Sequence, residues 1–289
     1  MKRRFVRAVL ASIAAAAVSA SASSAQAQEI ELTGPLKGAP AVRHMRLYRE
    51  GRFSIAPAIS FSLLDQYRRT ILVGATLNYN ITDWLSIGVW GAYGLLNSTT
   101  DLTDQIDSHA PRDALTATNV NHTGAYPMYG HAPFADQTAL MDWVVAPQLT
   151  FVPFRGKLAI FNKIFVDTDL FISAGEAIAG IEERGNCGDT GQPVCSDPNS
   201  FKRVSSTKFS YGTYAVGLTF YPADVWSLGV EYRAFPFAWN LAGFDSRGSG
   251  PNGNFPDNKV NSQDDTFHFN QVITIMVGFS FPTKAKVSE

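Results

Sequence analysis

The feature that most constrains this chain is an alternation of large apolar and small side chains that repeats every two residues. In residues 53–63, Phe, Ile and Leu fill most odd positions, whereas Ser and Ala fill the even ones. Residues 70–79 and 85–95 repeat the pattern. A period of two predicts extended strands with one apolar face and one small, weakly polar face. Because only residues 80–83 separate the second and third runs, these two are predicted to form an antiparallel hairpin.

Five further runs follow the same rule, at about 139–152, 157–174, 207–221, 225–239 and 266–281. Short turns follow the second, fourth and sixth runs, at 80–83, 153–156 and 222–224. Long connections rich in Asn, Asp, Ser, Gly and Pro follow the third, fifth and seventh, at about 97–138, 175–206 and 240–265. Such alternating connections predict an all-β, eight-stranded antiparallel up-and-down transmembrane barrel with three long external loops. No helix of any length is predicted.

A soluble barrel that encloses a ligand would also show eight alternating strands, so the second face of the strands must decide between the two folds. That face carries mostly Ser, Gly, Ala, Thr and Asn, which suit the crowded interior of a narrow barrel. Charged residues make up only 17% of the chain, below the roughly 25–35% of a soluble protein's surface. The sequence therefore predicts that the apolar face meets lipid.

Aromatic residues gather where the predicted strands end, as in the two interfacial rings of a membrane protein. The ring near the short turns is assigned to Tyr79, Trp84, Phe151, Phe154, Tyr221, Trp226 and Phe281. The ring near the long connections is assigned to Tyr93, Trp143, Phe171, Tyr232, Trp239 and Phe267.

The predicted strands also carry charges and prolines. The charged residues assigned to the lumen are Asp142, Lys163, Asp167, Asp169, Glu231 and Arg233. Because an unpaired buried charge is costly, we expect them to pair with one another. A polar plug is favoured over a conduction or proton path, since eight strands leave little room for a channel. Pro57 and Pro147 each remove a ladder donor, so bulges or local water are expected there.

The chain ends suggest export. Residues 1–27 read as a secretory signal, with basic residues, an apolar segment and an A-x-A motif. Residues 28–51 form a lead-in, 52–281 the barrel and 282–289 a C-terminal tail. No later run of about 18 apolar residues exists, which argues against a helical membrane protein. The basic residues between Arg43 and Arg52 favour a solvated linker, with contact to anionic headgroups or to a periplasmic partner as the alternative.

Charge excludes one class of partner. Four of the 24 basic residues lie in the leader, so 20 basic and 25 acidic residues remain and the mature net charge is −5. Nucleic-acid binding would require a basic patch, and none is seen.

Candidate sites are few. Cys187 and Cys195 lie in a polar stretch of an exported chain and are predicted to form a local disulfide rather than to remain free thiols. A metal site would need further ligands, and the spacing of the three Asp at 101, 104 and 107 does not match a calcium loop. No cofactor is predicted. Nucleophilic catalysis would need His268 with Ser210 or Ser280, and a satisfied polar histidine is the favoured interpretation.

The opening, middle and late hairpins of the chain carry a family resemblance. The segments RLYREGRFSIAP (46–57), LLDQYRRT and LNYNITDWLSIGV, then residues 151–175 and residues 214–235, resemble the outer-membrane β-barrel domain family known from myxobacteria and relatives. This resemblance implies a barrel in the outer membrane of a Gram-negative cell. It implies little about activity, although some members are associated with envelope-spanning motility or adhesion assemblies.

We therefore expect a non-enzymatic structural or interaction component of the envelope. Its expected partners are outer-membrane lipids, including lipopolysaccharide, and a periplasmic or envelope-complex protein. An outer-membrane enzyme for acyl transfer or deacylation and a narrow pore are the alternatives. The long connection at 97–138 and the loop with the two cysteines fall outside the shared pattern, so any specific role is expected there.

Overall fold

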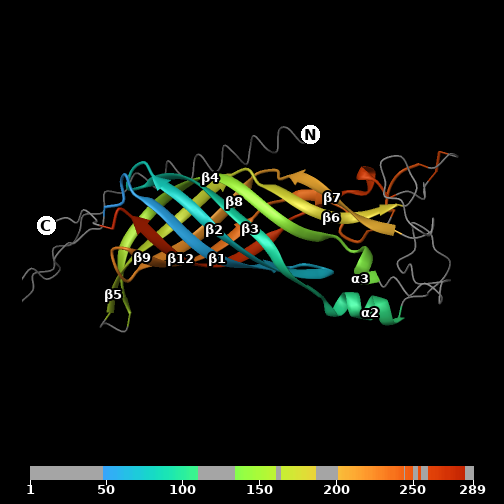
Figure 1. Cartoon of the computed structure of the whole chain (residues 1–289), viewed down its shortest axis with the longest axis horizontal. Helices are drawn as coiled ribbons and strands as arrows, with labels where there is room; N and C mark the ends of the chain where they lie inside the picture. The colour runs from blue at the N-terminus through green and yellow to red at the C-terminus, as the bar shows by residue number, and fades with distance from the viewer. Residues whose placement is uncertain are drawn as a thin grey trace, which may run out of the picture. The chain divides into compact units, whose positions relative to one another are not determined.

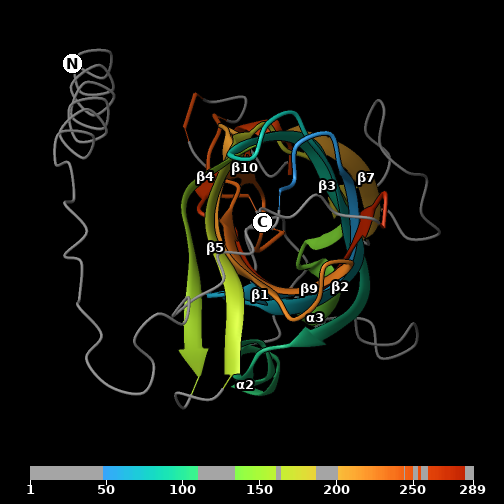
Figure 2. The same cartoon turned by 90° about the vertical axis from the view of Figure 1, so that its left-hand side faces the viewer.

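The computed structural model describes residues 48–109, 134–160, 164–186, 201–243, 245–249, 253–254 and 260–283. Eight strands form a closed antiparallel ring in which each pairs with its neighbours and β3 pairs with β4 to close it (Figures 1 and 2). They are β1 (Phe53–Leu63), β2 (Arg68–Asn80), β3 (Leu85–Thr99), β4 (Leu140–Ile160), β5 (Ile164–Gly175), β8 (Thr213–Tyr221), β9 (Trp226–Ala234) and β12 (Gln271–Phe281). The predicted eight-stranded barrel is confirmed.

The side chains alternate as the period of two requires. On β12, Ile275 is 54% exposed whereas Thr274 is fully buried. Across the β1–β12 pair, Ile59 faces Ile275 and Ser60 faces Thr274, and the hydroxyls of Ser60 and Thr274 lie 2.7 Å apart. Large apolar side chains thus cover the outside of the barrel and small polar ones fill the inside. This is the orientation of a transmembrane barrel, and the reverse of a soluble barrel that encloses an apolar ligand.

Two hairpins extend the barrel at the end away from the β2–β3 and β8–β9 turns. Here β6 (Ile178–Asn186) pairs with β7 (Phe201–Phe209), and β10 (Phe237–Trp239) pairs with β11 (Thr266–His268). The β6–β7 hairpin continues the wall, since β6 takes over from β5 as the partner of β4 (Figure 1). Within the predicted long connection at 175–206, residues 178–186 and 201–206 are therefore strand.

Pro147 lies opposite the point where β5 gives way to β6. Pro147 of β4 stays in register with Val89 of β3, and its carbonyl accepts a hydrogen bond from Glu176 N at 3.3 Å, in the gap between the two strands. Pro57 also stays in register, with Ala75 of β2. The expected bulges are absent from both sites. On the other side of Pro57, the pairing between β1 and β12 is interrupted between Ile55 and Ala58.

The predicted turn at 153–156 is wrong. Strand β4 runs on to Ile160 and pairs with β5 from Ile164, so this hairpin extends past the rim of the barrel (Figure 2). The register shifts between Phe151 and Phe154, and the extra residues form a bulge that includes Pro153. A bulge tolerates proline because it does not need the missing N–H.

The prediction of no helix is also wrong. Helix α2 spans Asp101–His109 and helix α3 spans Phe134–Gln137. Thr100 precedes α2, and its Oγ1 accepts a hydrogen bond from Thr103 N at 3.5 Å. Asp101 and Asp104 lie in the first turn, where acidic groups complement the helix dipole. Among the described helices, none is long and apolar enough to cross a membrane.

Candidate functional site

The barrel mouth at the short-turn end is closed by the residues that precede β1. Arg49 is only 7% exposed, and its guanidinium forms an ion pair with the carboxylate of Asp169 on β5. The same guanidinium lies over the ring of Tyr221, 4.1 Å from the ring centroid. Arg155 of β4 approaches Asp169 to 3.8 Å and Asp83 of the β2–β3 turn to 3.6 Å.

Backbone hydrogen bonds fix the same segment. The amides of Arg49 and Glu50 donate to Asp83 Oδ1 at 2.7 and 3.2 Å. Arg52 is 4% exposed and donates from Nη2 to the carbonyl of Asp224 at 2.8 Å. Burial lowers the pKa of Arg52, although Asp224 opposes this shift. Arg49 and Arg52 therefore belong to the barrel mouth, which corrects their prediction as part of a solvated linker.

Behind Arg49 lies a polar cavity of about 90 Å³. Ser, Thr and Asn side chains of the small face form much of its wall, including Ser54, Thr76, Asn78, Ser86, Thr150 and Ser173. Thr76 Oγ1 and Asn78 Oδ1 have no hydrogen-bond partner among the described residues. A cavity with such lining is suited to ordered water or a small polar group.

Above the cavity, a charged layer crosses the lumen. Arg233 is fully buried and donates from Nε to Glu231 Oε1 at 2.8 Å. It also donates to Gln148 Oε1 at 2.6 Å and to Thr213 Oγ1 at 3.3 Å. Its guanidinium lies over the indole of Trp90, 4.6 Å from the ring centroid. The two charges are thus compensated by each other and by neutral hydrogen-bond partners.

The next layer is apolar. Trp90, Phe235, Phe237 and Trp239 form a chain of aromatic rings whose successive centroids lie 5.3–6.4 Å apart. Each of these residues is at most 5% exposed. The smaller members of the layer include Leu72, Val144, Ile181 and Val272. Side chains therefore fill this part of the lumen.

The far end is capped by α3 and the loops. Arg184 of β6 donates from Nη1 to Gln137 Oε1 at 2.9 Å and to the carbonyl of Gly243 at 2.7 Å. Gly243 has a positive φ of 71°, and a Cβ there would lie 2.0 Å from the carbonyl oxygen of Gln137. Arg68 of β2 donates to Thr138 Oγ1 at 2.7 Å. These bonds join α3 to both sides of the barrel.

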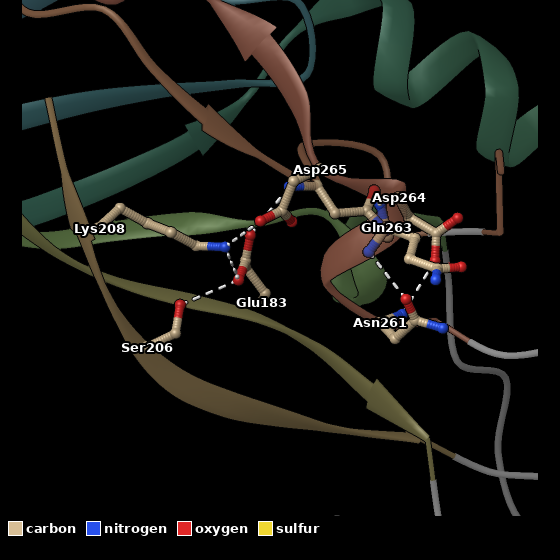
Figure 3. A network of polar contacts seen from close by, with 9 residues as sticks. Glu183, Ser206, Lys208, Asn261, Gln263, Asp264 and Asp265 are labelled. Atoms are coloured by element: carbon tan, nitrogen blue, oxygen red, sulfur yellow. Dashed lines mark hydrogen bonds and ion pairs between the residues drawn. The ribbon is translucent and has the colours of Figure 1, made fainter. Parts of the chain in front are cut away.

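A second polar cluster, the external clamp, joins the two hairpins (Figure 3). Lys208 Nζ lies 3.1 Å from Glu183 Oε2 and 2.5 Å from Asp265 Oδ2. Ser206 donates to Glu183 at 2.9 Å, and the Asn240 amide donates to the other oxygen of Glu183 at 2.8 Å. Burial raises the pKa of the Asp265 carboxyl, while the hydrogen bond from Lys208 lowers it.

The adjoining segment is also held by a carboxylate. Asp264 accepts from the amides of Ser246 and Arg247 at 2.8 and 2.9 Å. It also accepts from the amide of Asn261 at 2.9 Å (Figure 3). A pocket of about 210 Å³ lies between this segment and the β6–β7 hairpin. No group of three or more potential metal ligands occurs in the described part of the chain.

The predicted lumen charges do not form one cluster. Glu231 and Arg233 pair in the middle of the barrel, while Asp169 pairs with Arg49 at the mouth. Asp142 lies in the electrostatic field of Glu182 and Arg203 instead. Asp167 is half-buried on the β4–β5 hairpin, opposite Lys157 in the backbone register. Lys163, Cys187 and Cys195 lie outside the described residues.

Ten of the thirteen aromatic residues assigned to the rings are exposed on the outer surface: Tyr79, Trp84, Tyr93, Trp143, Phe151, Phe154, Trp226, Tyr232, Phe267 and Phe281. Tyr221, Phe171 and Trp239 are wrongly assigned, because they share the inward parity of their strands. Tyr221 lines the cavity, Phe171 is 8% exposed, and Trp239 lies in the apolar layer.

The residues considered for catalysis do not come together. His268 Nε2 and Thr266 Oγ1 lie 2.8 Å apart, and burial lowers the pKa of this histidine. Ser210 donates to Glu176 Oε1 at 3.2 Å and accepts from the amide of Ala177 at 2.9 Å. Ser280 lies near the short-turn end of β12, opposite Ser54. No nucleophile–base pair is formed from these three residues.

The sequence matches no protein-family model and no curated protein. Solved structures give distant similarities. The N-terminal β-barrel domain of OprF from Pseudomonas aeruginosa is 11% identical, with 80% of this chain and 98% of that chain covered and a TM-score of 0.38. OprG from the same organism is 10% identical over 82% and 99%, with a TM-score of 0.36. Ail of Yersinia pestis is 16% identical over 80% and 99%, with a TM-score of 0.27. These values are too low to transfer a role from those proteins to this chain.

Proposed function

We propose that this protein is a non-enzymatic β-barrel of the Gram-negative outer membrane and a structural or interaction component of the cell envelope. Two observations together carry the proposal. The outer face of the strands exposes large apolar side chains, and buried side chains of the charged and apolar layers fill the lumen. Such a barrel holds its loops and turns at the membrane surface and leaves no open path for solutes through the lumen. It suits an assembly for motility, adhesion or a link across the envelope.

The outer surface supports a lipid partner. The exposed side chains between the two aromatic rings are almost all apolar, as in the membrane-facing band of known barrels. On β1, the 11 residues from Phe53 to Leu63, at roughly 3.3 Å each and tilted near 40°, span about 25–28 Å. Lipopolysaccharide and phospholipid are the partners that this band would meet.

The external clamp supports a role in which the hairpins form a binding surface for a partner. Lys208, Glu183 and Asp265 hold the β6–β7 hairpin against the segment that leads into β11. A fixed pair of hairpins presents the same surface to a partner at every encounter, so less ordering entropy opposes binding than for loose loops. The partner surface is therefore assigned to these hairpins and to the connection at 97–138.

Fractionation and electrophysiology test the proposal. The mature protein should be found in the outer-membrane fraction, and in planar bilayers it should give only background current. Discrete conductance steps would support the narrow-pore alternative. Recovery of the protein from the soluble periplasm would contradict the proposal altogether.

The enzymatic alternative has its own test. Purified protein and a His268→Ala variant are compared for deacylation and acyl transfer on lipid A. We expect neither to show activity, because Ser210 bonds Glu176 and Ser280 lies opposite Ser54, so neither candidate nucleophile is brought to His268. Activity in the parent that is lost in the variant would establish an enzyme.

Cross-linking through the 97–138 connection and the β6–β7 hairpin in intact cells would identify the protein partner.

A further inference from the structure

The groups that surround the guanidinium of Arg49 all belong to the barrel itself. Asp169 comes from β5, Tyr221 from the end of β8, and Arg155 from β4. Asp83, which holds the backbone of Arg49, belongs to the β2–β3 turn. Arg49 alone comes from a segment outside the barrel, four residues before β1 begins at Phe53. The site is therefore built by the barrel, and its occupant is delivered from outside.

The chemistry of the site fits a guanidinium group. Asp169 provides a carboxylate for charge-assisted hydrogen bonds, and Tyr221 provides an aromatic face at 4.1 Å. A planar, delocalised guanidinium can use a carboxylate and an aromatic face at the same time. A compact ammonium is more strongly hydrated and lacks the planar surface, so it fits the pair of groups less well.

Asp169 keeps one cationic neighbour when Arg49 is absent. Asp169 is 2% exposed, and an uncompensated carboxylate at this depth would be costly. Arg155 lies 3.8 Å from Asp169 and is itself only 13% exposed in its side chain. It can therefore compensate Asp169 in part in the absence of Arg49, while it also lies 3.6 Å from Asp83. The polar cavity behind Arg49 provides room and hydrogen-bond acceptors, including Asn78 Oδ1.

We propose that the short-turn mouth is a binding site for a substituted guanidinium, and that Arg49 is its exchangeable resident. When the segment at 48–52 withdraws, the site takes another guanidinium of the same kind, and the cavity opens toward the short-turn end. The segment at 48–52 is thus a plug in which the Arg49 side chain occupies the guanidinium site, while the amides of Arg49 and Glu50 bind Asp83. This site does not depend on the proposed envelope role, since its test uses the isolated protein.

Chemical rescue tests the site in the full mature chain in detergent micelles. An Arg49→Ala variant is titrated calorimetrically with ethylguanidinium, with ethylammonium as the matched ligand. We expect the variant to bind ethylguanidinium with a Kd of about 1–10 mM and ethylammonium at least about tenfold more weakly. The parent protein, whose site is occupied, should bind neither. An Arg49→Ala/Asp169→Asn double variant should lose at least about tenfold in affinity for ethylguanidinium.

Three outcomes would overturn the inference. These are a folded Arg49→Ala variant that does not bind ethylguanidinium, equal affinity for both ligands, and equal affinity in the single and double variants. The first would mean that the site does not exist without the lead-in, and the others would mean that binding does not use the Asp169 carboxylate with a planar cation.

A labelling experiment covers the case in which Arg49→Ala fails to fold. Ser227 lines the cavity and is 8% exposed, so a Ser227→Cys change in a background without Cys187 and Cys195 reports access to the cavity. With the milder Arg49→Lys change, a water-soluble thiol reagent should modify this cysteine several-fold faster than with Arg49 present. Ethylguanidinium should slow it again. Identical rates with and without the Arg49→Lys change, or no protection by ethylguanidinium, would refute the plug.

Discussion

Glu231 and Arg233 lie two residues apart on β9, and their side chains meet inside the lumen with Arg233 Nε and Glu231 Oε1 at 2.8 Å. Both are almost fully buried. The spacing of two directs both side chains to the same face of the strand, and the closed ring makes that face the interior. The pair is surrounded by Gln148, Thr213 and Trp90. It marks the boundary between the polar and apolar halves of the lumen.

Breaking this pair should be more damaging than removing it. Glu231→Gln leaves the guanidinium of Arg233 buried without its carboxylate, so we expect the free energy of unfolding to fall by about 3–5 kcal/mol. A Glu231→Gln/Arg233→Met double variant removes the buried charge and should recover at least about 1 kcal/mol. Urea unfolding of protein refolded in lipid vesicles measures both. A double variant that is no more stable than Glu231→Gln would contradict the assigned pairing.

The apolar layer should contribute more to stability than the outer aromatic surface. Phe237 is 1% exposed, so Phe237→Ala should cost about 3–5 kcal/mol by leaving a cavity in the lumen. Phe269 has the same side chain and is 53% exposed on the outside, so Phe269→Ala is the matched control. It should cost clearly less in the same unfolding assay. Equal losses would mean that the lumen is not packed at Phe237.

Asp65 should make stability depend on pH. Burial in the β1–β2 turn raises the pKa of its carboxyl from 3.8 to about 6, against a hydrogen bond from Ser62. Between about pH 4 and 6 the folded state binds more protons than the unfolded state, so stability should fall as the pH rises through this window. Asp65→Asn should remove this contribution and stabilise the protein at pH 7 by on the order of 1–3 kcal/mol. Unfolding curves of parent and variant that stay parallel from pH 4 to 7 would disprove it.

Lys208 should stabilise the β6–β7 hairpin locally and contribute little to the stability of the barrel strands. Lys208→Met leaves Glu183 and Asp265 without their shared ammonium, and we expect a local loss of about 1–3 kcal/mol. Hydrogen exchange should then speed up by roughly tenfold or more at the amides of β6 and β7. The amides of β12 serve as the internal control and should keep their rates. Faster exchange throughout the barrel would argue against a local clamp.

The barrel could be predicted from the sequence because the pattern repeats every two residues, so the position of each residue in a strand indicates whether its side chain points inward or outward. The parity that predicts Ile275 outside and Thr274 inside also applies to Trp239 of β10, whose odd position continues the inward positions of Glu231 and Arg233 on β9. Tyr221 could have been placed in the same way. These two errors, like that at Phe171, came from giving aromatic character more weight than parity.

Other features had no local signal. Arg49 and Asp169 are 120 positions apart in the sequence, and their pairing depends on how the chain before β1 turns into the mouth. The external clamp joins Glu183, Lys208 and Asp265 from three separate segments. Closure of the ring brings Asp169 to Arg49, whereas the clamp needs the segment before β11 to pack on the β6–β7 hairpin, so neither cluster follows from spacing along the chain.

The central claim is that the apolar face of the strands points out of the ring into lipid. Spin labels placed singly at Ile275 and Met276 in vesicle-bound protein test it most directly, because these neighbours are 54% and 8% exposed. Collision rates are measured with oxygen, which concentrates in lipid, and with a water-soluble nickel complex. The label at position 275 should collide frequently with oxygen and rarely with nickel, while the label at position 276 should be poorly accessible to both. Strong nickel collisions at position 275 would contradict the account.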